Sequence, residues 1–567
     1  MAKIISLKPD FPKGDAEFEA ERKKIVDDVL NKIPKDLILP DNIINEPPPR
    51  VIDIPRDSGL LTKQEIEITE NYDLVGIAKE IAERRLTSVD VTKAFCRRAA
   101  IAHQLTFCLT EFYMSEALSQ AQLLDDHLAT TGKVVGPLHG IPISIKEMIP
   151  VRDQICSLGL KVTREVKKED CVATAILREL GAVFYVKTHQ PAAVFSVEST
   201  SFLGRTLNPY NIHLAPGGSS GGEGALLAMR GSIFGFGTDI GGSIRMPASF
   251  CGLYGLKGSD GFLPIEGMLS GPFPAGMFVP GILGPLGHSL RDVDFVVRCM
   301  REVKPWLRDQ DVIPRPYMGL EGVEGLSKET LSIGIMSDYG NVQPQPPVKE
   351  AMDWVNEQLT KDGFKVLPYK FPDPQKAHKL YSALLSMDGW TAIRSAFAAG
   401  REPTFPVFEE LVKQLLAESP DAAEGKESSA LAIADLKWQR DVLRAEVLAD
   451  WIAQGDPDIV IAPMSPAAPH DTADLVKSVS GTHYWNLVDY PAFVVPIPIN
   501  VGGKGSYKAK EYEEVEPRSK ADEDTKEIWK NHDMEGAPIC VQIIAKRRME
   551  SELIAAAGLI QKALWLP

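Results

Sequence analysis

Two glycine-flanked serine segments, APGGSSGG at 215–222 and GTDIGGSIRMP at 237–247, are the parts of this sequence best suited to chemistry. Glycines beside a serine let the backbone turn tightly and expose consecutive N–H groups, which can bind the oxyanion of a tetrahedral intermediate. A serine at such a turn is a candidate nucleophile if a base can take its proton. Ser243 and Ser219 are therefore the first candidates, and a glycine-rich turn before a helix is the structural alternative.

Other glycine-rich motifs fit these segments less well. A phosphate-binding loop needs GxxxxGK[ST], and no lysine follows the glycines here. The stretch 218–221, Gly-Ser-Ser-Gly, misses the GxSxG nucleophile elbow by one position. A dinucleotide-binding turn is not indicated either, because no GxGxxG follows a clear strand. A nucleophilic serine is the chemistry that remains.

The base that would activate this serine is a lysine and not a histidine. None of the ten histidines stands in a motif typical of a triad base, and His139 is the nearest rival only because it lies seven residues before Lys146. Lys146 ends the apolar run ISIK. Burial disfavours the ammonium form and lowers the pKa by up to about 3–5 units, which would leave an amine able to accept a proton. A lysine that extends from a strand end into solvent is the alternative.

These residues together form a Ser–Lys variant of triad logic. Ser243 would attack, Ser219 would relay the proton, and neutral Lys146 would accept it. The proton could then return through the relay to a leaving amine.

Composition narrows the function classes. The chain has 567 residues, of which 44% are hydrophobic, and its net charge of −15 argues against a nucleic-acid partner. Seven widely spaced cysteines without a CxxC pair indicate a reducing compartment and disfavour a zinc site or a disulfide framework. The N-terminus lacks the apolar core of a signal peptide, and no apolar run reaches the roughly 18 residues that a spanning helix needs. We expect a cytoplasmic protein without a membrane anchor.

Periodicity predicts an α/β architecture around these segments. A βαβ unit over 332–368 requires a partly parallel sheet, and 375–455 is mostly helical. Other expected helices cover 71–86, 88–104, with Thr87 as its cap, and 552–564, and other expected strands cover 140–146, 182–188, 457–467, 490–500 and 539–545.

Two segments lie outside this regular pattern. Residues 16–33 have helical periodicity and precede a stiff NEPPPR linker, so we expect an N-terminal helical arm over 1–70 and a catalytic body over 71–567. Residues 503–535 are highly charged, which predicts an exposed surface insertion.

Five segments of the sequence closely resemble the amidase signature family. The resemblance covers roughly residues 70–567 and is nearest to fungal acetamidase-type amidases, more distantly to fatty acid amide hydrolases. The segments are GPLHGIPISIKEMI, APGGSSGGEGALLA, GTDIGGSIRMPASFCGLYGLK, NLVDYPAFVVPIPIN and GAPICVQIIAKRRMESELIAAAGLI.

The resemblance implies a fold and a set of site residues. The fold is α/β, with a large central mixed β-sheet covered by helices on both faces. The catalytic lysine of the family falls on Lys146, its relay serine, which follows a cis peptide bond, on Ser219, and its acyl-forming serine on Ser243. The remaining positions are the oxyanion donors Ile240, Gly241, Gly242 and Ser243, the supporting residues Ser220, Asp239 and Arg245, and Val194 in the loop that lines the acyl pocket.

The implied activity is hydrolysis of carboxylic amides through an acyl-enzyme intermediate, without a metal or an organic cofactor. Small aliphatic or aromatic amides are the expected substrates, and carbamates and esters are further candidates. The alternatives are the glutaminase subunit of a tRNA-dependent amidotransferase, a fatty acid amide hydrolase, and a non-catalytic binding protein on the same scaffold. A homodimer is expected by analogy with the family.

Overall fold

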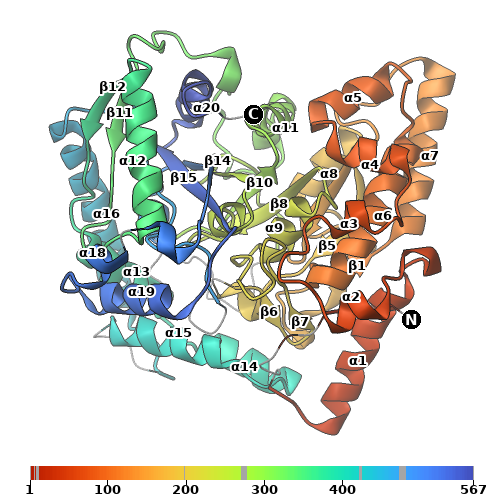
Figure 1. Ribbon diagram of the computed structural model, residues 1–567, viewed down its shortest axis with the longest axis horizontal. Helices are drawn as coiled ribbons and strands as arrows, with labels where there is room; N and C mark the ends of the chain where they lie inside the picture. Colours follow the sequence, from red (N-terminus) through yellow and green to blue (C-terminus); the bar gives the residue numbers. More distant parts are fainter. Residues whose placement is uncertain are drawn as a thin grey trace.

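A mixed sheet of eleven strands runs through the molecule (Figure 1), and its third and fourth strands carry Lys146 and Asp239. The computed structural model describes residues 2–5, 7, 12–196, 198–269, 278–419, 424–471, 481–507 and 509–565. The strand order is β1-β5-β2-β8-β10-β9-β14-β15-β13-β11-β12. The strands are β1 (Leu109–Phe112), β2 (Pro142–Lys146), β5 (Val183–Thr188), β8 (Phe234–Asp239), β9 (Tyr254–Lys257), β10 (Ile282–Gly287), β11 (Ser332–Ile335), β12 (Lys365–Pro368), β13 (Ile459–Pro463), β14 (Ala492–Asn500) and β15 (Pro538–Ala545). Two short hairpins lie outside the sheet, β3 (Ile155–Cys156) with β4 (Glu165–Val166), and β6 (Thr200–Ser201) with β7 (Gly204–Arg205).

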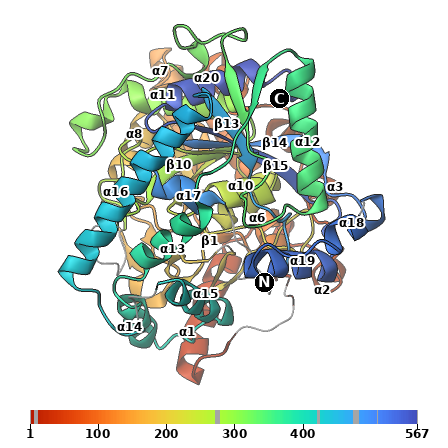
Figure 2. The same cartoon turned by 90° about the vertical axis from the view of Figure 1, so that its left-hand side faces the viewer.

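Helices cover both faces of the sheet, as the family resemblance implies. Figure 2 shows α12 and α16 on opposite sides of strands β13, β14 and β15. The helices are α1 (Ala16–Asn31), α2 (Asp41–Asn45), α3 (Ile54–Asp57), α4 (Lys63–Glu70), α5 (Leu74–Ala82), α6 (Ser88–Thr106), α7 (Met114–Thr131), α8 (Val172–Glu179), α9 (Gly221–Ala228), α10 (Arg245–Phe250), α11 (Leu290–Glu302), α12 (Pro346–Lys361), α13 (Pro374–Leu385), α14 (Thr391–Gly400), α15 (Pro406–Ala417), α16 (Ala430–Ala453), α17 (Thr482–Leu487), α18 (Ala509–Glu513), α19 (Lys520–Asn531) and α20 (Glu550–Ile560).

The pairing of β2 with β8 decides where the candidate residues meet. The two strands are parallel, with Ser144 opposite Gly235 and Ile145 opposite Phe236. Parallel strands end at the same edge of a sheet, and ligands of open α/β sheets bind beyond that edge. Every residue of both strands is buried, as expected for strands covered on two faces. Lys146, the last residue of β2, therefore lies beside the end of β8.

The predicted elements of the second half form as expected. Strands β11 and β12 are parallel and α12 connects them, which confirms the βαβ unit. The stretch 375–455 contains α13 to α16, and β13, β14, β15 and α20 occupy the positions predicted for late strands and a closing helix. In the first half, the Thr87 side chain accepts the Asp90 N–H and caps α6, as predicted.

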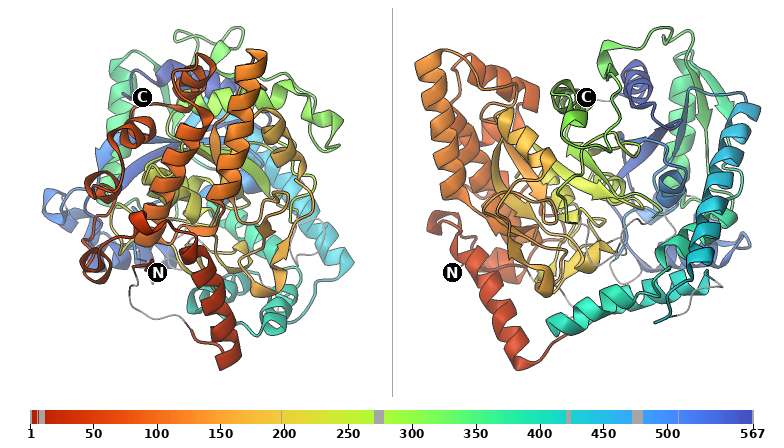
Figure 3. Two further views of the ribbon diagram at one scale, coloured as in Figure 1. Left: turned by 90° about the vertical axis from the view of Figure 1, so that its right-hand side faces the viewer. Right: turned by 180° about the vertical axis from the view of Figure 1, so that it is seen from behind.

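The N-terminal arm packs on the body and shares its core. Figure 3 shows the red N-terminal helices against the orange helices α6 and α7. The Ile5 N–H donates to the carbonyl oxygen of Gln104 at 3.0 Å, and the Gln104 side chain accepts the Leu39 N–H. Val29 and Leu30 belong to the same apolar cluster as the strands of the sheet. Helix α4 ends at Glu70, but the boundary at 70 stays a prediction.

The charged insertion is more deeply packed than expected. Residues 503–535 form α18 and α19, and α19 buries Ile528 and Trp529 completely. The Lys526 ammonium donates to the carbonyl oxygen of Tyr512 at 2.9 Å. The charge pattern therefore does not separate the two faces of α19, since the charged residues Asp522 and Lys526 are buried together with Ile528 and Trp529. No helix in the described ranges combines the length and the apolar character needed to cross a membrane.

Candidate active site

Lys146 and Ser219 are in direct contact. The Lys146 Nζ atom lies 2.6 Å from the Ser219 Oγ atom and 2.9 Å from the Oγ1 atom of Thr238. Lys146 is fully buried, so solvent does not compete for the amine. The parallel register of β2 and β8 explains the Thr238 contact, because Thr238 is the penultimate residue of β8.

The surroundings of Lys146 favour a neutral amine. Burial lowers its pKa to about 7, although the carboxylates of Asp239 and Glu223 act in the opposite direction. The Thr238 hydroxyl donates to the sulfur of Met148 at 3.3 Å, so its oxygen accepts a hydrogen from the lysine. A neutral amine has one lone pair, and this arrangement leaves that lone pair for the Ser219 hydroxyl. The geometry is that of a lysine that can take the proton of Ser219.

The loop before α9 turns Ser219 toward the lysine. The Gly218–Ser219 peptide bond is cis, as the resemblance implied, and Gly217 has a φ of +79°. A Cβ atom on Gly218 would lie 2.3 Å from the carbonyl oxygen of Glu198, so only glycine fits there. The next residue joins the two serine segments, since the Ser220 N–H donates to the carbonyl oxygen of Ser243 at 3.1 Å.

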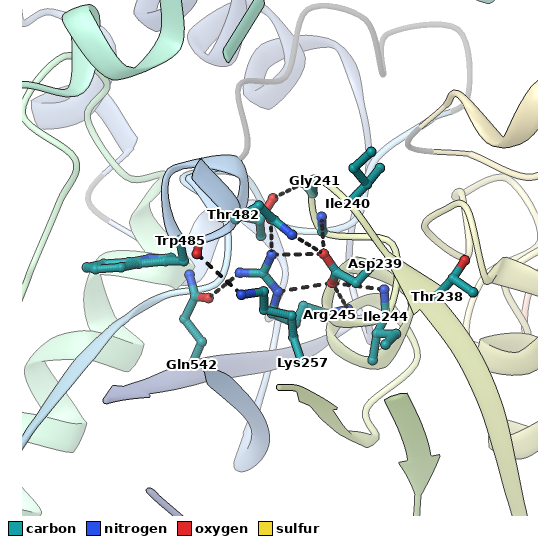
Figure 4. A network of polar contacts seen from close by, with 12 residues as sticks. Thr238, Asp239, Ile240, Gly241, Ile244, Arg245, Lys257, Thr482, Trp485 and Gln542 are labelled. Carbon is teal, nitrogen blue, oxygen red and sulfur yellow. Dashed lines mark hydrogen bonds and ion pairs between the residues drawn. The ribbon is translucent and has the colours of Figure 1, made fainter. Parts of the chain in front are cut away.

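Asp239 and Arg245 form a fully buried ion pair directly after β8 (Figure 4). The Asp239 carboxylate accepts hydrogen bonds from the guanidinium of Arg245, from the amide of Asn486 at 2.8 Å, and from the N–H of Gly242 at 2.8 Å. Burial alone would raise the pKa of Asp239, but Arg245 and these hydrogen bonds hold it well below its ordinary value. Arg245 also donates to Gln542 at 3.2 Å. The supporting role predicted for both residues has a geometric basis here.

The N–H groups of residues 240–243 have different partners. Gly242 donates to Asp239, so its N–H is committed to the carboxylate. Within the described part of the chain, no acceptor is found for the N–H groups of Ile240, Gly241 and Ser243. Of the four oxyanion donors that the resemblance implies, three N–H groups therefore remain as candidates. Ser243 is 9% exposed and Ser219 is 1% exposed, so Ser243 is the more accessible serine.

Val194 is brought to the same side of the molecule as the oxyanion segment. It ends the short 3₁₀ turn Ala192–Val194 with a φ of +58°. Val194 and Ile240 both pack against one aromatic-rich cluster, which contains Tyr381 and Trp390. The structure thus places the residue predicted to line the acyl pocket on the same apolar cluster as the start of the oxyanion segment.

Sequence reasoning missed several residues of this site. Thr238, Asn486 and Gln542 all contact predicted site residues. The position of Gln542 could have indicated a role in the site, because it is a polar residue inside the apolar run ICVQIIA. The rival base, His139, uses Nδ1 to accept the N–H of Val135 at 3.0 Å, away from both serines.

Comparison with known proteins agrees with this geometry. A family model described as Amidase matches residues 90–554. The chain belongs to the amidase signature family. It is 36% identical to an acetamidase of Emericella nidulans over 91% of this chain and 93% of that protein. It is 34% identical to an acetamidase of Aspergillus oryzae, again over 91% of this chain and 93% of the relative.

A solved structure titled fatty acid amide hydrolase resembles this amidase along almost its whole length. The TM-score is 0.87 at 31% identity, and the match covers 97% of this chain and 96% of the other. The family and these relatives make the protein a hydrolase that acts on amides. A binding protein without activity on the same scaffold is accordingly set aside.

Proposed function

We propose that this amidase cleaves carboxylic amides with Ser243 as nucleophile, Ser219 as proton relay and Lys146 as base. The observation that carries the proposal is the 2.6 Å contact between Ser219 Oγ and a fully buried lysine amine whose pKa burial lowers to about 7. A base with a pKa near the working pH is the most effective one for proton transfer.

In the acylation step, Ser243 Oγ attacks the carbonyl carbon of the amide. The Ser243 proton passes to Ser219 and the Ser219 proton passes to Lys146, while the carbonyl π electrons move to the oxygen. The N–H groups of Ile240, Gly241 and Ser243 stabilise this oxyanion. When the C–N bond breaks, Lys146 returns the proton through Ser219 to the leaving nitrogen. Water then attacks the acyl-enzyme by the same relay and releases the acid.

The proposed substrates are small aliphatic or aromatic amides. The acetamidase relatives and the apolar cluster around Val194 support this class. Amides of fatty acids are the second candidate, and the similarity to the fatty acid amide hydrolase structure favours them. Turnover of acetamide, benzamide and oleamide, measured as ammonia release, separates the two classes. Matching carbamates and esters extend the panel.

Labelling with a fluorophosphonate tests the nucleophile. We expect the wild-type protein to gain the mass of one phosphonyl group on the peptide that contains Ser243. Ser243→Ala should gain none, while Ser249→Ala, a serine four positions beyond the arginine of the same segment, should label normally. A label on any other residue, or an unchanged label in Ser243→Ala, would contradict the proposal.

We further propose a cytoplasmic location and a homodimer. All seven cysteines are buried and free of disulfides, which supports a reducing compartment. Imaging of a fluorescent fusion tests the location. Light scattering over a range of concentrations tests the homodimer.

A further inference from the structure

We infer that Thr482 and Tyr381 are positioning residues that hold the backbone turn presenting the oxyanion-binding N–H groups of this amidase. This role rests on the proposed function of residues 240–243 as the oxyanion site. The two side chains come from α17 and α13, more than 130 positions after the segment that they contact.

The carbonyl oxygens of the segment carry the inference, since each of them accepts a hydrogen bond. The hydroxyl of Thr482 donates to the carbonyl of Gly241 at 2.5 Å, and the hydroxyl of Tyr381 donates to the carbonyl of Ile240 at 3.4 Å. Two backbone N–H groups satisfy the other carbonyls: Met246 donates to Gly242 at 2.6 Å and Ser220 donates to Ser243 at 3.1 Å.

Holding a carbonyl fixes the N–H of the same peptide unit. A peptide unit is planar, and in the trans form its C=O and N–H point in opposite directions. The Tyr381 contact with the Ile240 carbonyl therefore sets the direction of the Gly241 N–H, one of the three proposed donors. Thr482 and Asp239 hold the following unit at its two ends, through the Gly241 carbonyl and the Gly242 N–H. That unit anchors the turn between the Gly241 donor and the Ser243 donor.

Because Gly241 and Gly242 have no side chains, the two hydroxyls lie where Cβ atoms would otherwise be. A Cβ atom on Gly241 would lie 2.2 Å from the Tyr381 hydroxyl oxygen, and one on Gly242 would lie 2.4 Å from Thr482 Oγ1. Gly242 also has a φ of +127°, which residues with side chains rarely adopt. The Gly-Gly pair thus admits two hydroxyls from distant helices, in addition to letting the backbone turn.

Helix α17 is itself held against the site, so the Thr482 hydroxyl has a defined place (Figure 4). One turn after Thr482, the amide of Asn486 donates to Asp239 at 2.8 Å. The buried ammonium of Lys257 donates to the carbonyls of Trp485 at 3.3 Å and Tyr490 at 2.9 Å. On the neighbouring helix α13, the ring of Tyr381 contacts the ring of His483 with centroids 4.9 Å apart. These contacts join α13 and α17 to the oxyanion segment as one rigid unit.

Removing one hydroxyl while keeping side-chain shape tests the inference. We expect Thr482→Val to lower kcat about 10- to 100-fold with KM within about twofold, because only the transition state carries the oxyanion. A trifluoromethyl ketone adds to Ser243 Oγ and places a negative oxygen at the oxyanion position. Its inhibition constant should rise by the same factor as kcat falls. Tyr381→Phe should lower kcat less, about threefold, since its bond is longer.

Matched variants separate positioning from a general loss of stability. Thr482→Ser keeps the hydroxyl and should restore most of kcat. Thr525→Val removes another buried hydroxyl, which donates to the carbonyl of Ala521 at 2.8 Å in the insertion, and should keep the wild-type kcat and inhibition constant. Thermal unfolding of each variant identifies those that do not fold. Tyr381→Phe, which loses a single oxygen atom, decides the question if Thr482→Val does not fold.

The outcomes distinguish this inference from the proposed function. Wild-type kinetics and ketone affinity in Thr482→Val, or in a folded Tyr381→Phe when Thr482→Val is unfolded, would overturn the positioning role while leaving Ser243 as nucleophile. An equal loss in Thr482→Val and Thr525→Val would also overturn it. If mass spectrometry finds no ketone adduct on Ser243 of the wild-type protein, the proposed function itself fails, and the positioning role fails with it.

Discussion

Two ionisable side chains are buried at the carboxyl ends of the neighbouring strands β2 and β8, and they behave in opposite ways. Lys146 at the end of β2 contacts two neutral hydroxyls. Asp239 at the end of β8 accepts six hydrogen bonds, including two from the guanidinium of Arg245. Burial lowers the pKa of Lys146 to about 7, whereas the partners of Asp239 keep its pKa well below the ordinary value.

The difference shows that burial alone does not decide the state of an ionisable group. Both side chains lose water, which disfavours the charged form of each. Asp239 regains the lost interactions from protein donors, so it stays charged and holds the backbone of residues 242–245. Lys146 regains only part of them, so it can exchange a proton near neutral pH. The first group maintains geometry, and the second fits the proposed role of base.

The largest expected effect is the loss of the base. Lys146→Met keeps an apolar side chain of similar length and removes the amine, so kcat/KM should fall about 10³-fold at pH 7. For the wild-type protein, kcat/KM should rise with pH through the lysine pKa of about 7 and then level off, because only the neutral amine accepts a proton. Initial rates between pH 5.5 and 9 give both results.

The Met variant also supplies the control for this pH dependence. Its residual activity should show no inflection near pH 7, although it can increase in alkali, where hydroxide replaces the base. An unchanged rate at neutral pH, or an inflection that persists in the variant, would assign the base to another group.

A smaller effect is expected when the buried ion pair of Asp239 and Arg245 is broken. Asp239→Asn leaves the guanidinium of Arg245 buried without its anion, and we expect the free energy of unfolding to fall by about 3 kcal/mol. Urea denaturation measures this loss. The half-exposed surface pair of Lys328 and Asp362 offers a comparison, since Asp362→Asn should change stability by less than about 1 kcal/mol. Similar losses in both variants would mean that the partners of Asp239 contribute little.

The third prediction concerns the stability cost of the proposed catalytic lysine. The pKa of Lys146 is lower in the folded protein than the ordinary 10.5, so the unfolded chain binds more protons between pH 7 and 10.5. The penalty is fully present below pH 7 and vanishes above 10.5. Lys146→Met should therefore raise the melting temperature by a few degrees at pH 6, and the gain should shrink toward pH 10. A constant or reversed difference would show that packing, and not charge, decides the effect.

The sequence was sufficient to predict the local features of this molecule. The strand that ends in Lys146, the βαβ unit and the capped helix α6 are each encoded within a short segment, whereas the cis bond before Ser219 was expected only from the family resemblance. The contacts that complete the site depend on distant segments. Thr238 could have been placed from the parallel register of β2 and β8, but Thr482 and Tyr381 lie on helices whose docking no local pattern specifies.

The buried side of the charged insertion has the same origin. Charge density alone does not reveal which residues of α19 are buried, because Asp522 and Lys526 are buried beside Ile528 and Trp529 once the helix packs on the fold. The commitment of the Gly242 N–H to Asp239 likewise follows from three-dimensional folding of the turn and not from the order of its residues. Local sequence patterns predict helices and strands, whereas the hydrogen-bond partners of individual groups depend on how distant segments pack together.

The bond from Arg245 to Gln542 joins residues that are 297 positions apart. A ribosome adds about 5–20 residues each second, so roughly 15–60 s of synthesis separate the two side chains. Throughout that interval the nascent polypeptide already carries its lysine and both serines but lacks β15, and for most of it α17 is missing as well. Both elements complete the network around Asp239 and Arg245. We therefore expect the enzyme to be catalytically inactive until translation is nearly finished. Prematurely terminated products should not hydrolyse amides.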